Sequence, residues 1–109
     1  MLKKQHRLTT AGFNEVFKVG RRLHTPYFQL IYIPSGDFHT AVVVGKKVSK
    51  TAVGRNRLRR QVYGAVYSFT QITPLAFTIL MVAKPALKNI PSRAVKPAVF
   101  EALTTLLAR

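Results

Sequence analysis

The residues of this chain that could do chemistry are concentrated in one basic stretch. The fifteen residues from Lys46 to Arg60, KKVSKTAVGRNRLRR, include seven of the eighteen Lys and Arg residues and no acidic residue. Because cations at this density repel one another and lower the stability of the folded state, a polyanion is the natural partner. A solvated charged face, the ordinary alternative, normally mixes both signs of charge. The stretch therefore predicts binding to the phosphates of a nucleic acid.

The basic stretch runs into a helix that we expect over about residues 51–69. At 3.6 residues per turn, five apolar residues share one face and would pack against a core. They are Leu58, Val62, Ala65, Val66 and Phe69. The opposite face would carry Asn56, Arg60, Tyr63 and Tyr67, flanked by Arg57 and Arg59, with Arg55 at the seam with the supporting layer. Arginine binds phosphate bidentately, and arginine and tyrosine both stack on bases, so this combination favours RNA.

The order of these residues resembles the protein subunit of bacterial ribonuclease P. Residues 55–60, RNRLRR, match the R-N-R-x-[KR]-R signature of that family, with Lys46 and Lys47 upstream at the expected spacing and Ala52 in its usual place. The resemblance extends over nearly the whole chain. It includes Arg7-Leu8, Phe13-x-x-x-Phe17, Ala83-Lys84 and an amphipathic helix at the end.

The resemblance implies a non-catalytic role beside a ribozyme. In that family the RNA subunit and its bound Mg²⁺ ions remove the 5′ leader of precursor tRNA, and the protein binds both the RNA subunit and the leader. The residues expected to face the catalytic RNA are Lys46, Lys47, Lys50, Arg55, Asn56, Arg57, Arg59 and Arg60. A leader-binding cleft between the first helix and the sheet would be lined by Phe13, Phe17, Tyr27, Gln29 and Ile31. Stacking on such rings tolerates any base sequence, but two aromatic residues on one helical face are almost as consistent with a place in the core.

Composition argues against several other functions. The three acids of the 109 residues, Glu15, Asp37 and Glu101, lie in different predicted elements, so neither a catalytic carboxylate pair nor a protein-held Mg²⁺ site is expected. The three histidines have no metal-ligand spacing, and the absence of cysteine rules out thiolate ligands and disulfides. We therefore expect no catalytic residue, no metal and no cofactor bound by the protein alone. A net charge of +15 makes nucleic acid the leading partner class, ahead of an anionic membrane surface. Without a signal peptide or a membrane-length apolar run, we expect a cytoplasmic protein with no membrane partner, and the resemblance implies RNA, not DNA, as the partner.

Other functions compete with the one that the resemblance implies. A ribosomal-protein-like RNA-binding module would explain the charge and the fold but not the ordered RNRLRR. A helix that enters a DNA major groove would need base-reading side chains, for which Asn56 qualifies and the crowded arginines are less suited. An autonomous nuclease would need carboxylates that the chain lacks.

The remaining sequence predicts one α+β domain in the order α-β-β-β-α-β-α. A basic arm over residues 1–8 would precede a helix that begins at Thr9 or Thr10 and is closed by Gly20. We expect strands over about 21–33 (broken near Pro26), 39–45 and 76–83, with 39–45 forming an antiparallel hairpin with the strand before it. The last helix would start near Lys96 after a loop over 86–91, with an apolar face of Val99, Phe100, Leu103, Leu106 and Leu107.

Together these elements predict a two-layer sandwich with a small mixed sheet of about four strands and three helices. The resemblance adds a left-handed crossover around the basic helix. Gly64 inside that helix costs about 1 kcal/mol relative to Ala, which indicates that another backbone approaches it closely.

Overall fold

The structure, a computed structural model, describes residues 10–108. The expected basic arm and Thr9 lie outside these residues. In chain order the elements are α1 (Thr10–Val19), β1 (Arg21–His24), β2 (Phe28–Pro34), β3 (His39–Val43), α2 (Ala52–Ile72), β4 (Phe77–Ala83), the 3₁₀ helices η2 (Pro85–Asn89) and η3 (Ser92–Ala94), and α3 (Val95–Leu107). This is the predicted order, with two short 3₁₀ helices in and after the segment expected to form a loop.

The four strands form one mixed sheet in the order β1-β2-β4-β3. β2 pairs antiparallel with both β1 and β4, whereas β3 and β4 are parallel and α2 connects them. The expected hairpin of β2 with β3 is therefore wrong, because β4 lies between them. The apolar run of β4 explains this order. Its residues 78–81 are buried on both faces, and a central position also pairs its backbone on both sides.

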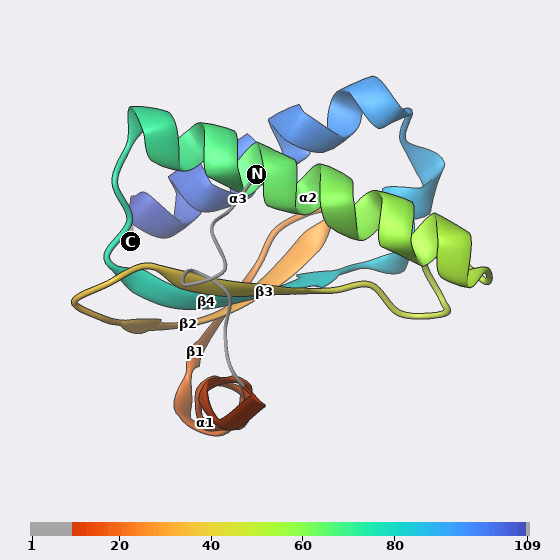
Figure 1. The fold of residues 1–109 in the computed structure, drawn as a ribbon. Helices are drawn as coiled ribbons and strands as arrows, with labels where there is room; N and C mark the ends of the chain where they lie inside the picture. Colours follow the sequence, from red (N-terminus) through yellow and green to blue (C-terminus); the bar gives the residue numbers. More distant parts are fainter. Residues whose placement is uncertain (1–9, 109) are drawn as a thin grey trace.

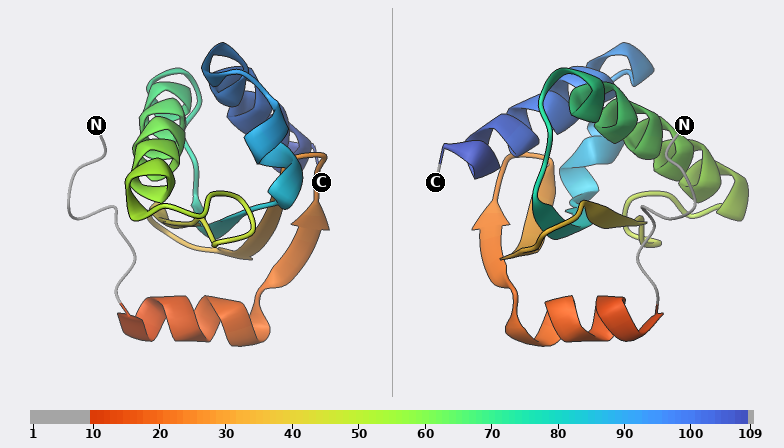
Figure 2. Two further views of the ribbon diagram at one scale, coloured as in Figure 1. Left: turned by 90° about the vertical axis from the view of Figure 1, so that its right-hand side faces the viewer. Right: turned by 60° about the vertical axis from the view of Figure 1, so that its left-hand side comes forward.

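Helices cover both faces of the sheet. α2 and α3 lie side by side on one face, and α1 lies alone on the other (Figures 1 and 2). The sheet and the α2–α3 layer form the predicted sandwich, to which α1 adds a cover on the second face. Because β2 and β4 carry large apolar groups on both faces, each face needs such a cover.

The larger core lies between the sheet and the α2–α3 layer. α2 contributes Val62, Ala65, Val66 and Phe69, as its periodicity predicts, although Leu58 is only partly buried. Phe69 of α2 meets Phe100 of α3 edge to face, with ring centroids 5.3 Å apart, so the two helices are joined by an aromatic contact as well as by aliphatic packing. In α3 the predicted apolar face is found except at Leu107, which is 41% exposed.

The smaller core lies beneath α1. It consists of Val16, Ile31 and Leu80, with Phe13 among the partly buried residues around them. Gly20 ends α1 without a positive φ, so the reason for glycine here is space. A Cβ at Gly20 would stand 2.5 Å from the Val16 carbonyl oxygen and 2.8 Å from Cγ2 of Ile31. The missing side chain lets the end of α1 approach β2 closely.

Two expectations for α2 are wrong. Tyr63 and Tyr67 do not lie on an outer face, because both are partly buried against the larger core. The Tyr63 hydroxyl accepts a hydrogen bond of 3.2 Å from the backbone N–H of Val42, which belongs to the edge strand β3. Tyr63 thereby covers a backbone donor at the edge of the sheet. No backbone approaches Gly64 closely either, since a Cβ there would have nothing within 4 Å.

Gly20 and Gly64 give opposite predictions for stability. Gly64→Ala should raise the free energy of unfolding by about 0.5–1 kcal/mol, because the helix interior favours alanine and the space is open. Gly20→Ala should lower it by about 1–3 kcal/mol, because backbone atoms must move to admit the methyl group. Denaturant titration of both variants beside the parent protein measures the two changes. A destabilised Gly64→Ala protein would show that the surroundings of this helix are not as open as described.

Candidate nucleic-acid interface

The basic loop between β3 and α2 is fixed by neutral groups. Val48 is 4% exposed and belongs to the larger core. The backbone N–H groups of Val48 and Ser49 both donate to the Gly45 carbonyl oxygen, at 3.1 and 3.3 Å, which closes a tight turn. Because one buried valine and one turn hold the loop, its three lysines are left free to point outward.

The start of α2 is built around the same loop. Thr51 is the N-cap, and its hydroxyl accepts a hydrogen bond of 3.0 Å from the Gly54 N–H. A Cβ at Gly54 would stand 2.2 Å from Oγ of Ser49 and 2.9 Å from Oγ1 of Thr51, so a larger residue here would displace the Ser49 side chain and the capping hydroxyl. Arg55 then ties the two together, since its guanidinium donates to the carbonyl oxygens of Ser49 and Lys50, both at 3.1 Å. The predicted place of Arg55 at the seam is thus the observed one.

Most side chains of the predicted interface with the catalytic RNA face solvent. Those exposed are Lys46, Lys47, Lys50, Asn56, Arg57 and Arg60. Arg55 and Arg59 are half-buried, and the Arg59 guanidinium donates a hydrogen bond to Oδ1 of Asn56 at 2.5 Å. Asn56 thereby orients one arginine of the signature while its own side chain stays on the surface.

All charged side chains of residues 46–60 are positive. The first turn of α2 contains no acidic residue, although a helix N-terminus ordinarily favours one because its backbone N–H groups carry partial positive charge. Seven Lys and Arg side chains from residues 46–60 add to that potential. An anion placed here gains from both sources, so the geometry suits several phosphates along a polynucleotide.

A second surface lies at the end of α1. Phe17 is 52% exposed, and its ring is nearly parallel to that of Phe13, with centroids 6.3 Å apart and an interplanar angle of 5°. Arg22 of β1, which sequence reasoning missed, completes the group. Its guanidinium carbon lies 5.2 Å from the Phe17 ring centroid, and one terminal nitrogen donates to the Phe17 carbonyl oxygen at 3.1 Å. Phe17 is therefore a surface residue, and an exposed ring beside a guanidinium is suited to stacking on a base.

The other residues expected in the leader-binding cleft are only partly brought together. Gln29 is half-buried, and the Arg22–Ile31 and His24–Gln29 pairs of β1 and β2 place it on the same sheet face as Arg22. Ile31 lies on this face as well, but it is 1% exposed beneath α1 and offers no surface to a ligand. Tyr27 precedes β2 and packs against the larger core. The sequence prediction grouped Tyr27 with Gln29 and Ile31 because alternate residues of a strand share one face. β2 begins at Phe28, so Tyr27 lies before the strand and does not follow this alternation.

A depression near α1 contains a carboxylate and an imidazole. It measures about 360 Å³, and its lining includes Glu15, His39, Ser35 and Thr78. No hydrogen bond or ion pair joins Glu15 to His39 within residues 10–108, and no group of three or more His, Cys, Asp or Glu residues there could hold a metal ion. In the same residues no helix is both long and apolar enough to cross a bilayer.

The sequence is similar to proteins of one known family. The family described as Ribonuclease P matches residues 2–107. A protein named "Ribonuclease P protein component" from a Nitratiruptor species is 39% identical over 79 residues, 72% of this chain and 71% of that protein. A protein of the same name from Synechococcus elongatus is 33% identical over 93 residues, 79% of this chain and 76% of that protein.

Solved structures agree in fold. The RNase P protein from Thermotoga maritima superposes with a TM-score of 0.75 at 24% identity, over 89% of this chain and 94% of that one. A mutant RNase P protein of Staphylococcus aureus, described as defective in mRNA degradation activity, gives a TM-score of 0.84 at 21% identity, over 94% of this chain and 89% of that one. At these identities the likeness concerns the α+β fold.

Proposed function

The chain belongs to the family of ribonuclease P protein components, and from that premise we propose how its surfaces divide the work. The protein binds the catalytic RNA through the basic loop and the N-terminal half of α2, and the 5′ leader of precursor tRNA through the Phe17 surface. The observation that carries the proposal is the set of cations at residues 46–60, most of them exposed and with no acid among them, held in place by Val48, Thr51 and Arg55.

Binding through the basic surface is electrostatic. Each phosphate that a lysine or arginine neutralises releases a condensed counterion, so affinity falls as salt rises. Arg57 and Arg60 are exposed and form no hydrogen bond or ion pair within residues 10–108, which leaves their forked donors available for bidentate contact. Arg55 contributes charge, and its Nη1 donates to the carbonyl oxygens of Ser49 and Lys50, so part of its role in RNA binding is to position Lys50 and its neighbours.

Bond cleavage belongs to the RNA partner in this proposal. Mg²⁺ held by the RNA would supply the activation of water, and the protein lowers the electrostatic cost of bringing two RNAs together. The placement of the acids supports this division. Glu15 is on α1, Asp37 lies between β2 and β3, and Glu101 is on α3, so the three carboxylates come from separate elements.

The leader is held by stacking. The exposed Phe17 ring and the Arg22 guanidinium beside it accept any base, because every base has a π-face. Gln29 adds a donor and an acceptor on the same sheet face. A processing enzyme meets leaders of many sequences, and contacts of this kind do not discriminate strongly among them.

A ribosomal-protein-like module without a processing role is the less favoured function. The match to one family over residues 2–107 and the ordered RNRLRR both favour a ribonuclease P component. A general RNA-binding module would need neither the fixed order of these residues nor a separate exposed aromatic surface.

Reconstitution tests the proposed function directly. Purified protein should leave precursor tRNA intact, because no carboxylate pair is assembled. Addition of a bacterial ribonuclease P RNA at low Mg²⁺ concentration should give cleavage at the 5′ end of the mature tRNA, faster than with the RNA alone. Gel analysis of end-labelled precursor tRNA measures both. Cleavage by the protein without RNA would refute the division of labour.

Removal of single arginines should reduce the number of bound phosphates. Arg57→Ala or Arg60→Ala should weaken binding to the catalytic RNA and reduce the magnitude of the slope of log affinity against log salt by about 0.7–0.9 for each phosphate that is no longer neutralised. Arg93→Ala, which removes an exposed arginine from η3, is the matched control and should leave the slope unchanged. An unaltered slope in both signature variants would exclude these two side chains from the interface.

Phe17→Ala should act on the leader alone. Removing the ring on which one base stacks, worth about 1–3 kcal/mol, should weaken binding of leader-bearing tRNA to the holoenzyme by about 5-fold to 150-fold, with little change for mature tRNA. Val19→Ala removes another exposed apolar side chain of α1 and serves as the control. Equal weakening for both tRNA substrates would place Phe17 outside the leader site.

A further inference from the structure

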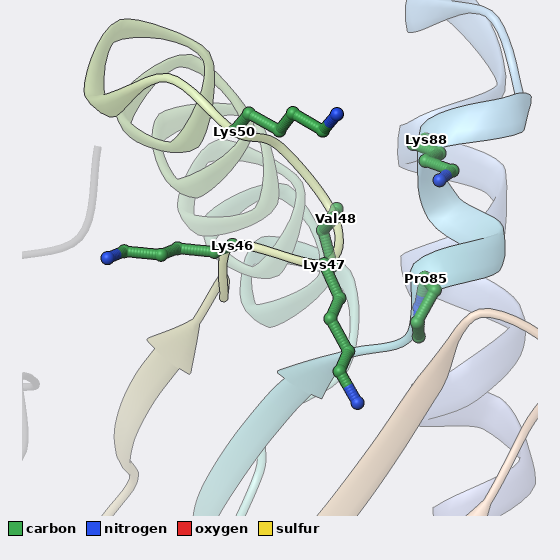
Figure 3. Close-up of a pocket in the computed structure, with 6 residues that line it drawn as sticks. All are labelled: Lys46, Lys47, Val48, Lys50, Pro85 and Lys88. Atoms are coloured by element: carbon green, nitrogen blue, oxygen red, sulfur yellow. The ribbon is translucent and has the colours of Figure 1, made fainter.

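A basic depression joins the loop before α2 to a segment far away in the sequence. It measures about 610 Å³ and is lined by Lys46, Lys47, Val48, Lys50, Pro85 and Lys88. In Figure 3, Lys50 extends from the loop toward the short helix η2 that carries Lys88, whereas Lys46 extends away from η2. Lys88 lies outside the signature, and nothing in its sequence surroundings singled it out.

Lys88 is held in this place by the core. The residue before it, Leu87, is 1% exposed and anchors η2. The segment is also fixed by backbone bonds, since the Lys84 N–H donates to the Tyr27 carbonyl oxygen and the Leu87 N–H to the Lys84 carbonyl oxygen, both at 2.9 Å. A lysine next to a buried anchor on a short helix points its ammonium group outward from a defined position. The depression is therefore a feature of two fixed segments.

The lining has the chemistry of a phosphate site. Four of the six lining residues are lysines and none is acidic. Each lysine ammonium offers three donors, although that of Lys46 points away from η2 (Figure 3). Val48 and Pro85 add apolar surface between the lysines. The volume lies in the range of roughly 300–1,000 Å³ that small-ligand sites occupy, so it can admit a phosphate with its attached sugar. Strong hydration and a compact charge make lysine a point-charge partner for phosphate.

We propose that this depression binds a backbone phosphate of RNA, and that Lys88 of η2 forms the side of the site opposite Lys50. The site rests on the proposed function, because it continues the basic surface of residues 46–60 onto a second element. An RNA strand that follows this surface passes from the α2 arginines to the loop lysines and on to Lys88. RNA is favoured over an acidic peptide because the depression is continuous with arginines suited to phosphate.

Lys88→Ala is the direct test, with affinity measured over a series of salt concentrations. It should weaken RNA binding several-fold at low salt and reduce the magnitude of the log–log slope by about 0.7–0.9. Lys96→Ala, which removes an exposed lysine whose ammonium lies 5.7 Å from the Phe100 ring centroid, is the control. Lys88→Arg keeps the charge and should retain the slope. Because Lys88 is exposed, both of its variants should unfold at the temperature of the parent protein.

Two binding measurements, one with ribonuclease P RNA alone and one with precursor tRNA and the assembled holoenzyme, identify the RNA that supplies the phosphate. If the slope changes for ribonuclease P RNA alone, the phosphate belongs to the catalytic RNA. If it changes only when the assembled holoenzyme binds precursor tRNA, the phosphate belongs to the substrate. Equal behaviour of Lys88→Ala and Lys96→Ala in both arms would overturn the proposal, and so would an acidic peptide that competes with RNA only when Lys88 is present. If the parent protein bound the RNA without salt dependence, the proposed function itself would be refuted. That result differs from a failure of the Lys88 site alone, in which the parent protein would still show salt-dependent binding.

Discussion

Mutual repulsion among the cations of residues 46–60 is the constraint on which the rest of this structure depends. Like charges at this density would spread an unsupported loop into solvent. The fold opposes them with groups that need no counter-charge: Val48 in the core, the Thr51 cap, and the Arg55 bonds to two carbonyl oxygens. Gly54 lets the loop and helix come close enough for those bonds. Because the charges are held together without acids, an external polyanion is what can neutralise them.

The sheet fixes the distance between the two proposed RNA surfaces. β4 is buried on both faces and pairs on both edges, so the α2–α3 layer and the α1 layer are packed onto one rigid element. The basic surface belongs to the first layer and the Phe17 surface to the second. In the proposed function this rigidity matters, since a protein that contacts a ribozyme and its substrate can align them only if its own contact points keep their separation.

Several features could be read from local patterns. The periodicity of α2 identified four of its buried residues, Val62, Ala65, Val66 and Phe69, and the same rotation placed Arg55 at the seam and left Arg57 and Arg60 exposed. α3 begins at Val95, beside the expected start near Lys96, with Pro97 in its first turn, and Pro74 follows the end of α2 at Ile72. These predictions succeed because helix periodicity, capping and proline chemistry act within a few residues of the chain.

The sequence by itself therefore determined the element order, the main buried face of α2 and the cationic surface, all of which depend on neighbours in the chain. Only the tertiary structure decided that β4 separates β2 from β3 and that Tyr63 covers the edge of β3. It also decided that Ile31 is buried beneath α1 and that Lys88 lines the same depression as the basic loop. Each of these depends on which distant segments share the core. Strand pairing and helix cover are chosen by the total burial of apolar surface and by backbone pairing across the whole domain, which no local pattern records.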